Sequence, residues 1–218
     1  MRRLLLLTLL AIVSGCATTA VVNVNVPGLE HSEQFRMQDL RPPSEKQQKL
    51  FSALVTSAAY GTSRVSETIT SPTGFRLLQH RIYEALHKDG EPLEVKVNHL
   101  VVYQNAKSEL RRGALGSAIG GVAGALIAAK TVRSPSGSIS SIGDPKPFES
   151  LSTDEYKRAL YTDEENPGRA SVLITYVDTE INGRRVLTRT VSPLRVKEGE
   201  VPLVNALEDS FKFHLSQY

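Results

Sequence analysis

Cys16 is the only cysteine in this 218-residue chain, and its thiol is the side chain with the most distinctive chemistry. A cysteine can act as a nucleophile, bind a metal ion or carry a covalent modification. Here it directly follows the small residues Ser14 and Gly15 and an apolar run over residues 4–13, which two arginines precede. This order of positive charge, apolar run and small residues is typical of a secretory signal that is removed after export.

The segment Val13-Ser14-Gly15-Cys16 resembles the lipobox of bacterial lipoproteins. The resemblance implies that residues 1–15 form a signal peptide, that the chain is cut before Cys16, and that Cys16 then carries a diacylglycerol thioether and an amide-linked acyl chain such as palmitate. Three acyl chains would hold the protein on a lipid bilayer. By the same resemblance, Ala17 favours the outer membrane of the cell envelope, with the domain on the periplasmic face. Residues 4–13 are too short to span a bilayer by themselves.

Removing the signal also changes the charge balance. The whole chain has 26 basic and 23 acidic residues, and cleavage removes Arg2 and Arg3, which leaves 24 against 23. A mature domain with so little net charge and no evident basic patch gives no indication of a nucleic-acid partner. Because lipid occupies the only thiol, no disulfide is expected, and the fold must depend on its core.

In a second unusual segment, residues 110–132, an uncharged stretch over residues 113–129 is flanked by Arg111 and Arg112 on one side and by Lys130 on the other. Small residues recur in it at steps of four, and two such rows would merge into one smooth strip on a helix, formed by Gly116, Gly120, Gly124, Ser117 and Gly121. The strip resembles the glycine zippers of envelope proteins and indicates close helix packing. Three interpretations stay open: membrane insertion or self-association, packing against the protein's own sheet, or a mobile insertion.

Other reactive side chains form no recognisable catalytic pattern. No two of the five histidines have the four-residue spacing that places two zinc ligands on one helical face, so no metal or other cofactor is expected. His80 and His87 are interpreted as part of a solvated helix face, and His99 as a hydrogen-bonded core residue. The acidic cluster at residues 154–155 and the Arg184-Arg185 pair are interpreted as solvated charges.

The clearest elements have strong periodicity. Apolar residues at three- and four-residue steps predict amphipathic helices over residues 71–89 and 201–215. Residues 92–103 alternate as in a strand, although the alternation fails near their end. An Asn182-Gly183 pair between two β-rich runs predicts a tight hairpin.

The remaining segments complete the predicted organisation. Residues 16–33 are expected to form a lipidated tether, residues 34–218 a single domain, and residues 133–150 a flexible linker after the zipper. A strand is predicted over 35–40, and residues 46–67 have both helical and strand features, with a strand or hairpin favoured in the second half. The fold class is α+β: an antiparallel sheet with two amphipathic helices on one face and an inserted Gly/Ala-rich helical segment.

In element order, the body of the chain resembles small envelope lipoproteins of the YajG type and the auxiliary lipoproteins of transport systems. We therefore expect a membrane-anchored, non-enzymatic accessory or scaffold protein, whose partner is another envelope protein or a second copy of itself. Two alternatives stay open: an envelope hydrolase or polymer-binding enzyme with a dispersed site, and a membrane oligomer held by the zipper.

Overall fold

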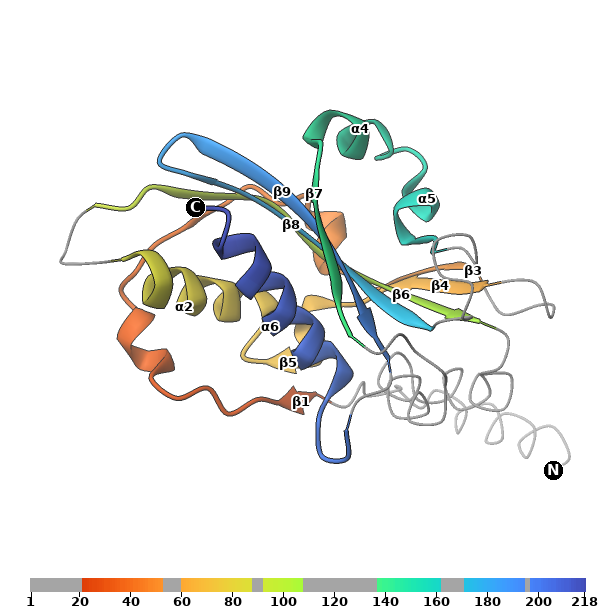
Figure 1. Ribbon diagram of the computed structural model, residues 1–218, viewed down its shortest axis with the longest axis horizontal. Helices are drawn as coiled ribbons and strands as arrows, with labels where there is room; N and C mark the ends of the chain where they lie inside the picture. Colours follow the sequence, from red (N-terminus) through yellow and green to blue (C-terminus); the bar gives the residue numbers. More distant parts are fainter. Residues whose placement is uncertain (1–20, 53–59, 88–91, 108–136, 162–170, 195–196) are drawn as a thin grey trace, which may run out of the picture.

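A seven-stranded, mostly antiparallel sheet organises the protein in the computed structural model, which describes residues 21–52, 60–87, 92–107, 137–161, 171–194 and 197–218 (Figure 1). Its strands follow the order β3-β4-β6-β8-β9-β7, and the short β2 pairs in parallel with β6. The bounds are β2 Gln38–Asp39, β3 Lys49–Ser52, β4 Tyr60–Arg64, β6 Val95–Lys107, β7 Ile139–Gly143, β8 Val172–Ile181 and β9 Arg184–Pro193.

Smaller elements surround this sheet. Two short strands, β1 Val22–Asn23 and β5 Thr70–Ser71, form a separate parallel pair. The 3-10 turns are η1 Leu29–Ser32, η2 Pro43–Lys46 and η3 Glu67–Ile69, and the helices are α2 Gly74–Leu86, α4 Pro145–Ser150, α5 Glu155–Ala159 and α6 Pro202–Leu215. This combination of helices with a mostly antiparallel sheet confirms the predicted α+β class.

Helices α2 and α6 cover one face of the sheet, as the periodicity of the sequence predicts (Figure 1). Thr73 begins α2 as its N-cap, because its hydroxyl accepts a hydrogen bond from the Arg76 N–H. The predicted apolar faces of the helices form the main core, in which Leu78, Ile82 and Phe211 are fully buried. Burial of each of these side chains stabilises the folded state by about 1.5–3 kcal/mol relative to leaving that side chain exposed.

The opposite face of the sheet has its own smaller core under α4 and α5. Phe148 from α4 and Ala159 from α5 pack there against Tyr103, Ile174 and Leu187 of the central strands. Strands β6 and β8 are therefore buried on both faces, which explains why the sequence of residues 172–177 reads as a nearly continuous apolar run.

A β-bulge explains why the alternation fails in the strand predicted over residues 92–103. The pairing of β6 with β8 shifts register between Val97 and His99. Before the bulge, Val95 and Val97 face the helices α2 and α6, and after it Leu100 and Val102 face them. One inserted residue reverses the face of every later side chain, so His99 turns toward α4 and α5.

The hairpin prediction at residues 170–191 is confirmed. Strands β8 and β9 pair in antiparallel register through Ile181 and Arg184, and Asn182 and Gly183 adopt φ values of 49° and 81°. Two central residues with positive φ define the type I′ turn that matches the twist of the two strands.

Several predicted boundaries are wrong. Residues 21–33 are part of the fold and not a tether, because β1 pairs with β5 and Val26 and Ser32 are buried. Residues 139–150 form β7 and α4 where a linker was expected, since Ser and Gly are compatible with an edge strand and Asp144 caps α4. The strand expected over 35–40 shrinks to β2, and β3 pairs with β4 in the ambiguous region 46–67.

The zipper residues 110–132 and the signal segment lie outside the described residues. Within the described ranges, no helix has both the length and the hydropathy needed to cross a membrane.

Candidate functional site

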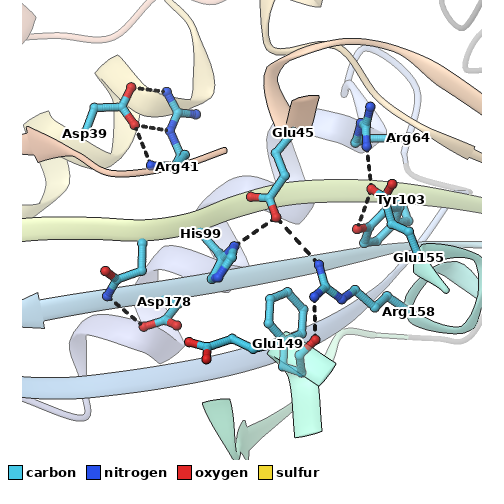
Figure 2. A network of polar contacts seen from close by, with 12 residues as sticks. Asp39, Arg41, Glu45, Arg64, His99, Tyr103, Glu149, Glu155, Arg158 and Asp178 are labelled. Carbon is cyan, nitrogen blue, oxygen red and sulfur yellow. Dashed lines mark hydrogen bonds and ion pairs between the residues drawn. The ribbon is translucent and has the colours of Figure 1, made fainter. Parts of the chain in front are cut away.

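A network of polar side chains lies on the α4/α5 face of the sheet around His99, which the β6 bulge directs to this side (Figure 2). His99 lies opposite Asp178 of β8. Its Nδ1 is 2.8 Å from Oε1 of Glu45, which η2 positions, and its ring makes an edge contact with the Phe148 ring, with centroids 4.9 Å apart. A carboxylate at one ring nitrogen selects the tautomer of the histidine and fixes the orientation of its ring.

Arg158 of α5 provides the positive charge that faces Glu45. Its Nη1 is 3.6 Å from Glu45 Oε1, its Nη2 donates to the Phe148 carbonyl, and its guanidinium lies 3.9 Å from the centre of the Phe148 ring. Glu45 and Arg158 are 5% and 4% exposed, so this ion pair is deeply desolvated. The pair connects η2 with α4 and α5, and breaking a pair of this kind leaves a costly buried charge.

Arg185 makes a second group of ion pairs beside His99. Its Nε and Nη2 donate to the carboxylate of the fully buried Asp178 over 2.6–3.2 Å, and Nη2 also donates to Glu149 at 2.6 Å. The hydrogen bonds from Arg185 to Asp178 raise the pKa of the guanidinium above its ordinary value. The hydrogen bond from the same arginine lowers the pKa of Glu149. Asn98 Nδ2 adds a further donor to Asp178 at 3.3 Å.

His99, Glu149 and Asp178 could in principle hold a metal ion. Each offers one ligand atom, and the three atoms lie within 4.8 Å of one another. However, the Arg185 guanidinium already binds both carboxylates. Since a metal ion would have to displace this arginine, the cluster acts chemically as an ion-pair network with a permanent organic cation.

A neighbouring cluster surrounds Glu155 at the start of α5. Its Oε1 accepts hydrogen bonds from the Arg64 guanidinium and, at 3.0 Å, from the Tyr103 hydroxyl, while its Oε2 is 3.3 Å from Lys49 Nζ. Burial raises the pKa of Glu155, but the hydrogen bonds from Arg64, Tyr103 and Lys49 outweigh burial, so the net pKa is lowered. Burial and the Glu155 charge raise the pKa of Tyr103. These groups therefore stay in fixed charge states near neutral pH.

The structure corrects the interpretation of several charged and histidine residues. Glu155 is not solvated, because its side chain is only 12% exposed and pairs with the buried Arg64. Arg184 and Arg185 are exposed, as expected, although Arg185 also pairs with the buried Asp178. His80 is buried and its Nδ1 is 3.0 Å from Ser32 Oγ, so it is not on a solvated face. His99 is hydrogen-bonded as expected, although its partner comes from a polar cluster.

The predicted lipid site Cys16 and the zipper residues Gly116, Ser117, Gly120, Gly121 and Gly124 lie outside the described residues. Sequence reasoning missed Glu45 and Arg158, because Glu45 pairs with His99 and Arg158, which lie more than 50 residues further along the chain. One signal was available: Asp178 follows the apolar and threonine-containing run of residues 172–177, and a carboxylate buried there requires a hydrogen-bonding or cationic partner.

Comparison of the chain with protein-family models, with curated proteins and with solved structures finds no match.

Proposed function

We propose that this protein is a lipid-anchored, non-enzymatic accessory lipoprotein of the cell envelope, which holds its α+β domain at a membrane surface to assist another envelope component. The Cys16 segment supports lipid attachment, and Ala17 supports sorting to the outer membrane. Anchoring raises the effective concentration of the domain toward partners on the same membrane.

The main observation behind this proposal is that the N-terminal segment and residues 108–136 both join the domain at the same end of the sheet. The registers place the end of β6 at Lys107 and the start of β7 at Ile139 at the end of the sheet opposite the Asn182-Gly183 turn. We call this the anchor end. Residues 108–136, which contain the zipper, are joined to the domain through these two strands.

The N-terminal part of the domain leads to the same end. Val22 of β1 pairs with Thr70, and Thr70 lines a small cavity together with Leu203 in the first turn of α6. The first turn of α6 follows β9, which ends at the anchor end at Pro193 (Figure 1). Four residues lie between Cys16 and Val21, and the five Cα–Cα steps between them can span at most about 18 Å, so lipid on Cys16 would hold this part of the domain near the bilayer. Residues 113–129 would then be connected close to the same bilayer, which supports a second contact through the zipper.

The ion-pair networks also support a role without catalysis. Glu155, Asp178 and Glu149 each bind arginine or lysine, which holds their charges in structural contacts. One observation favours the second candidate, an envelope hydrolase: Glu45 orients the His99 ring, as a carboxylate does for a general base. If purified envelope polymer releases soluble fragments with the wild type and not with His99→Gln, the enzyme is favoured.

Metabolic labelling with palmitate and fractionation of the membranes test the proposal. We expect label in the wild-type protein, its loss in Cys16→Ser, and a shift of Ala17→Asp from the outer to the inner membrane. An unlabelled wild-type protein, or a Cys16→Ser protein that fractionates with the outer membrane as before, would contradict lipid anchoring. Detergent-stable multimers that disappear in Gly120→Leu would favour the third candidate, a zipper-held oligomer.

A further inference from the structure

The two edge strands of the sheet differ in how well they are protected against pairing. At one edge, β3 begins with Lys49 and has an irregular register between Leu50 and Ser52. Both features discourage the addition of another strand. At the other edge, β7 has the uncharged sequence ISSIG and a regular register with β9. Its apolar side chains Ile139 and Ile142 are 58% and 64% exposed.

The backbone of β7 offers pairing groups on its outer side. In a two-residue hairpin the residues that flank the turn exchange hydrogen bonds, so in β9 the even-numbered residues from Arg184 bond to β8. The odd-numbered residues of β9 therefore bond to Ile139, Ser141 and Gly143 of β7. It follows that the N–H and C=O groups of Ser140 and Ile142 point away from the sheet. Among the described residues, no strand pairs with this side.

A groove follows the same edge. It is open, has a volume of about 420 Å³, and lies between β7 and α6, lined by Ser138, Ser140, Asp209, Lys212, Phe213 and Ser216. Asp209 already accepts a hydrogen bond from Ser138. Lys212 is exposed, and its side-chain ammonium has no hydrogen-bond or ion-pair partner within the described part of the chain. The Asp209 carboxylate is thus held by Ser138, and the Lys212 ammonium is the charged donor that the groove offers to a ligand.

We propose that β7 and this groove bind an extended segment of another protein, which adds a strand to the sheet, places apolar side chains against Ile142 and Phe213, and presents an acidic side chain to Lys212. Backbone hydrogen bonds would provide affinity, and the groove would provide specificity. This inference rests on the proposed accessory function, for which it names the partner surface and the chemistry of the partner.

The anchor end argues for another protein as the occupant in preference to a second copy. Two β7 strands related by a two-fold axis pair in antiparallel fashion. The sheets of the two copies would then point in opposite directions, with their anchor ends at opposite sides of the dimer. Lipids on both copies could not enter one bilayer in that arrangement, whereas a strand from another protein is not restricted in this way.

The test uses the full-length, lipidated protein in detergent micelles and a fluorescent peptide with blocked ends, made of alternating threonine and valine with one central glutamate. Fluorescence anisotropy measures binding. The matched variants are Ile142→Lys and Leu50→Lys, since Leu50 is 67% exposed on the opposite edge. We expect Ile142→Lys to weaken binding by about tenfold or more and Leu50→Lys to leave it unchanged, because a lysine blocks only the edge that bears it.

Two further variants separate the contributions to binding. Ile142→Pro removes an outward N–H and no hydrogen bond to β9, so it should also weaken binding while thermal unfolding stays close to the wild type. Lys212→Ala should weaken binding of the glutamate peptide by about threefold and not change binding of a glutamine peptide. Light scattering checks for dimers.

Equal affinities for Ile142→Lys and Leu50→Lys, or no binding by the folded wild type, would overturn the inference. A dimer that Ile142→Lys dissociates would also overturn it, by showing that a second copy occupies the edge. The same measurement on Cys16→Ser distinguishes the two proposals: peptide binding does not need lipid, so a failure of palmitate labelling would refute the anchor and leave the binding result intact.

Discussion

His214 makes the stability of this protein sensitive to acid. The side chain belongs to α6, on the face of the sheet that α2 and α6 cover, and is fully buried. Its Nε2 is 2.7 Å from Thr179 Oγ1 and its Nδ1 is 2.9 Å from Thr188 Oγ1, so neutral hydroxyls occupy both ring nitrogens. Burial lowers the pKa of His214 from 6.5 to about 3 in the folded protein, because desolvation disfavours the charged imidazolium.

The sign of the effect follows from this lowered pKa. Above pH 6.5 the ring is neutral in both states, and His214 adds no dependence on pH. Between pH 6.5 and 3 the unfolded chain binds a proton that the folded protein excludes, so the free energy of unfolding falls by about 1.4 kcal/mol per pH unit. Between pH 7 and pH 5 the loss amounts to about 2 kcal/mol, a large fraction of the 5–15 kcal/mol typical of small domains.

Urea unfolding followed by circular dichroism at pH 5, 6 and 7 measures this loss. The substitution His214→Gln keeps an amide donor and acceptor near the two threonines but removes the titrating ring. We expect wild type to lose about 2 kcal/mol more than His214→Gln between pH 7 and pH 5. The control His31→Gln should behave as wild type, since the His31 side chain is 71% exposed. Equal losses in wild type and His214→Gln, or an NMR titration of folded His214 near pH 6.5, would refute the reasoning.

Three further substitutions test the packing, the turn and the ion-pair network, each by urea unfolding at pH 7. Phe211→Ala should lower the free energy of unfolding by about 3–5 kcal/mol, because the ring is fully buried; a loss below about 1 kcal/mol would contradict its place in the core. Gly183→Ala should cost about 1 kcal/mol, since φ is 81° there; no cost would contradict the type I′ turn. Asp178→Asn should cost about 1–3 kcal/mol through Arg185, and Leu50→Ala, an exposed control, should change stability by about 0.5 kcal/mol or less.

The elements that the sequence predicts well are those whose signal is local. The helices α2 and α6 follow from apolar residues at helical spacing, and the β8–β9 hairpin follows from Asn182-Gly183. In each case the residues that determine the structure lie within about fifteen positions of one another. The same holds for the start of α2, where the cap is Thr73.

The polar network could not be predicted in this way. His99 faces Glu45 only because a bulge reverses the faces of β6, and the partners of Glu155 and Asp178 come from separate elements. Interactions between residues so far apart in the sequence depend on the tertiary arrangement, and the periodicity of the sequence contains no information about it. The alternation of apolar and polar residues fails at Leu100 because of the bulge. This failure could have been interpreted as a change in the face of the sheet to which the side chains point.

Composition misled the prediction at residues 139–150. Serine and glycine are common in linkers, but here Ser138, just before β7, donates a hydrogen bond to Asp209 of α6, and Ser140 of β7 is hydrogen-bonded to Thr190 of β9. A mobile linker would not pair in regular register with β9, whereas β7 does so, from Ile139 opposite Val191 to Gly143 opposite Leu187.

The position of β7 connects the anchor with the inferred partner surface. The strand begins at the anchor end and runs toward the hairpin end, antiparallel to β9. If lipid on Cys16 holds the anchor end at the membrane, the open edge extends away from the bilayer and not along it. A partner strand that adds to this edge therefore has to approach from the side of the domain. The partner must extend above the membrane surface by the length of several residues of a strand. A chain that lies flat on the bilayer could not pair with Ser140 and Ile142 in this geometry, which restricts the occupant to a segment that projects from the membrane or is free in the surrounding compartment.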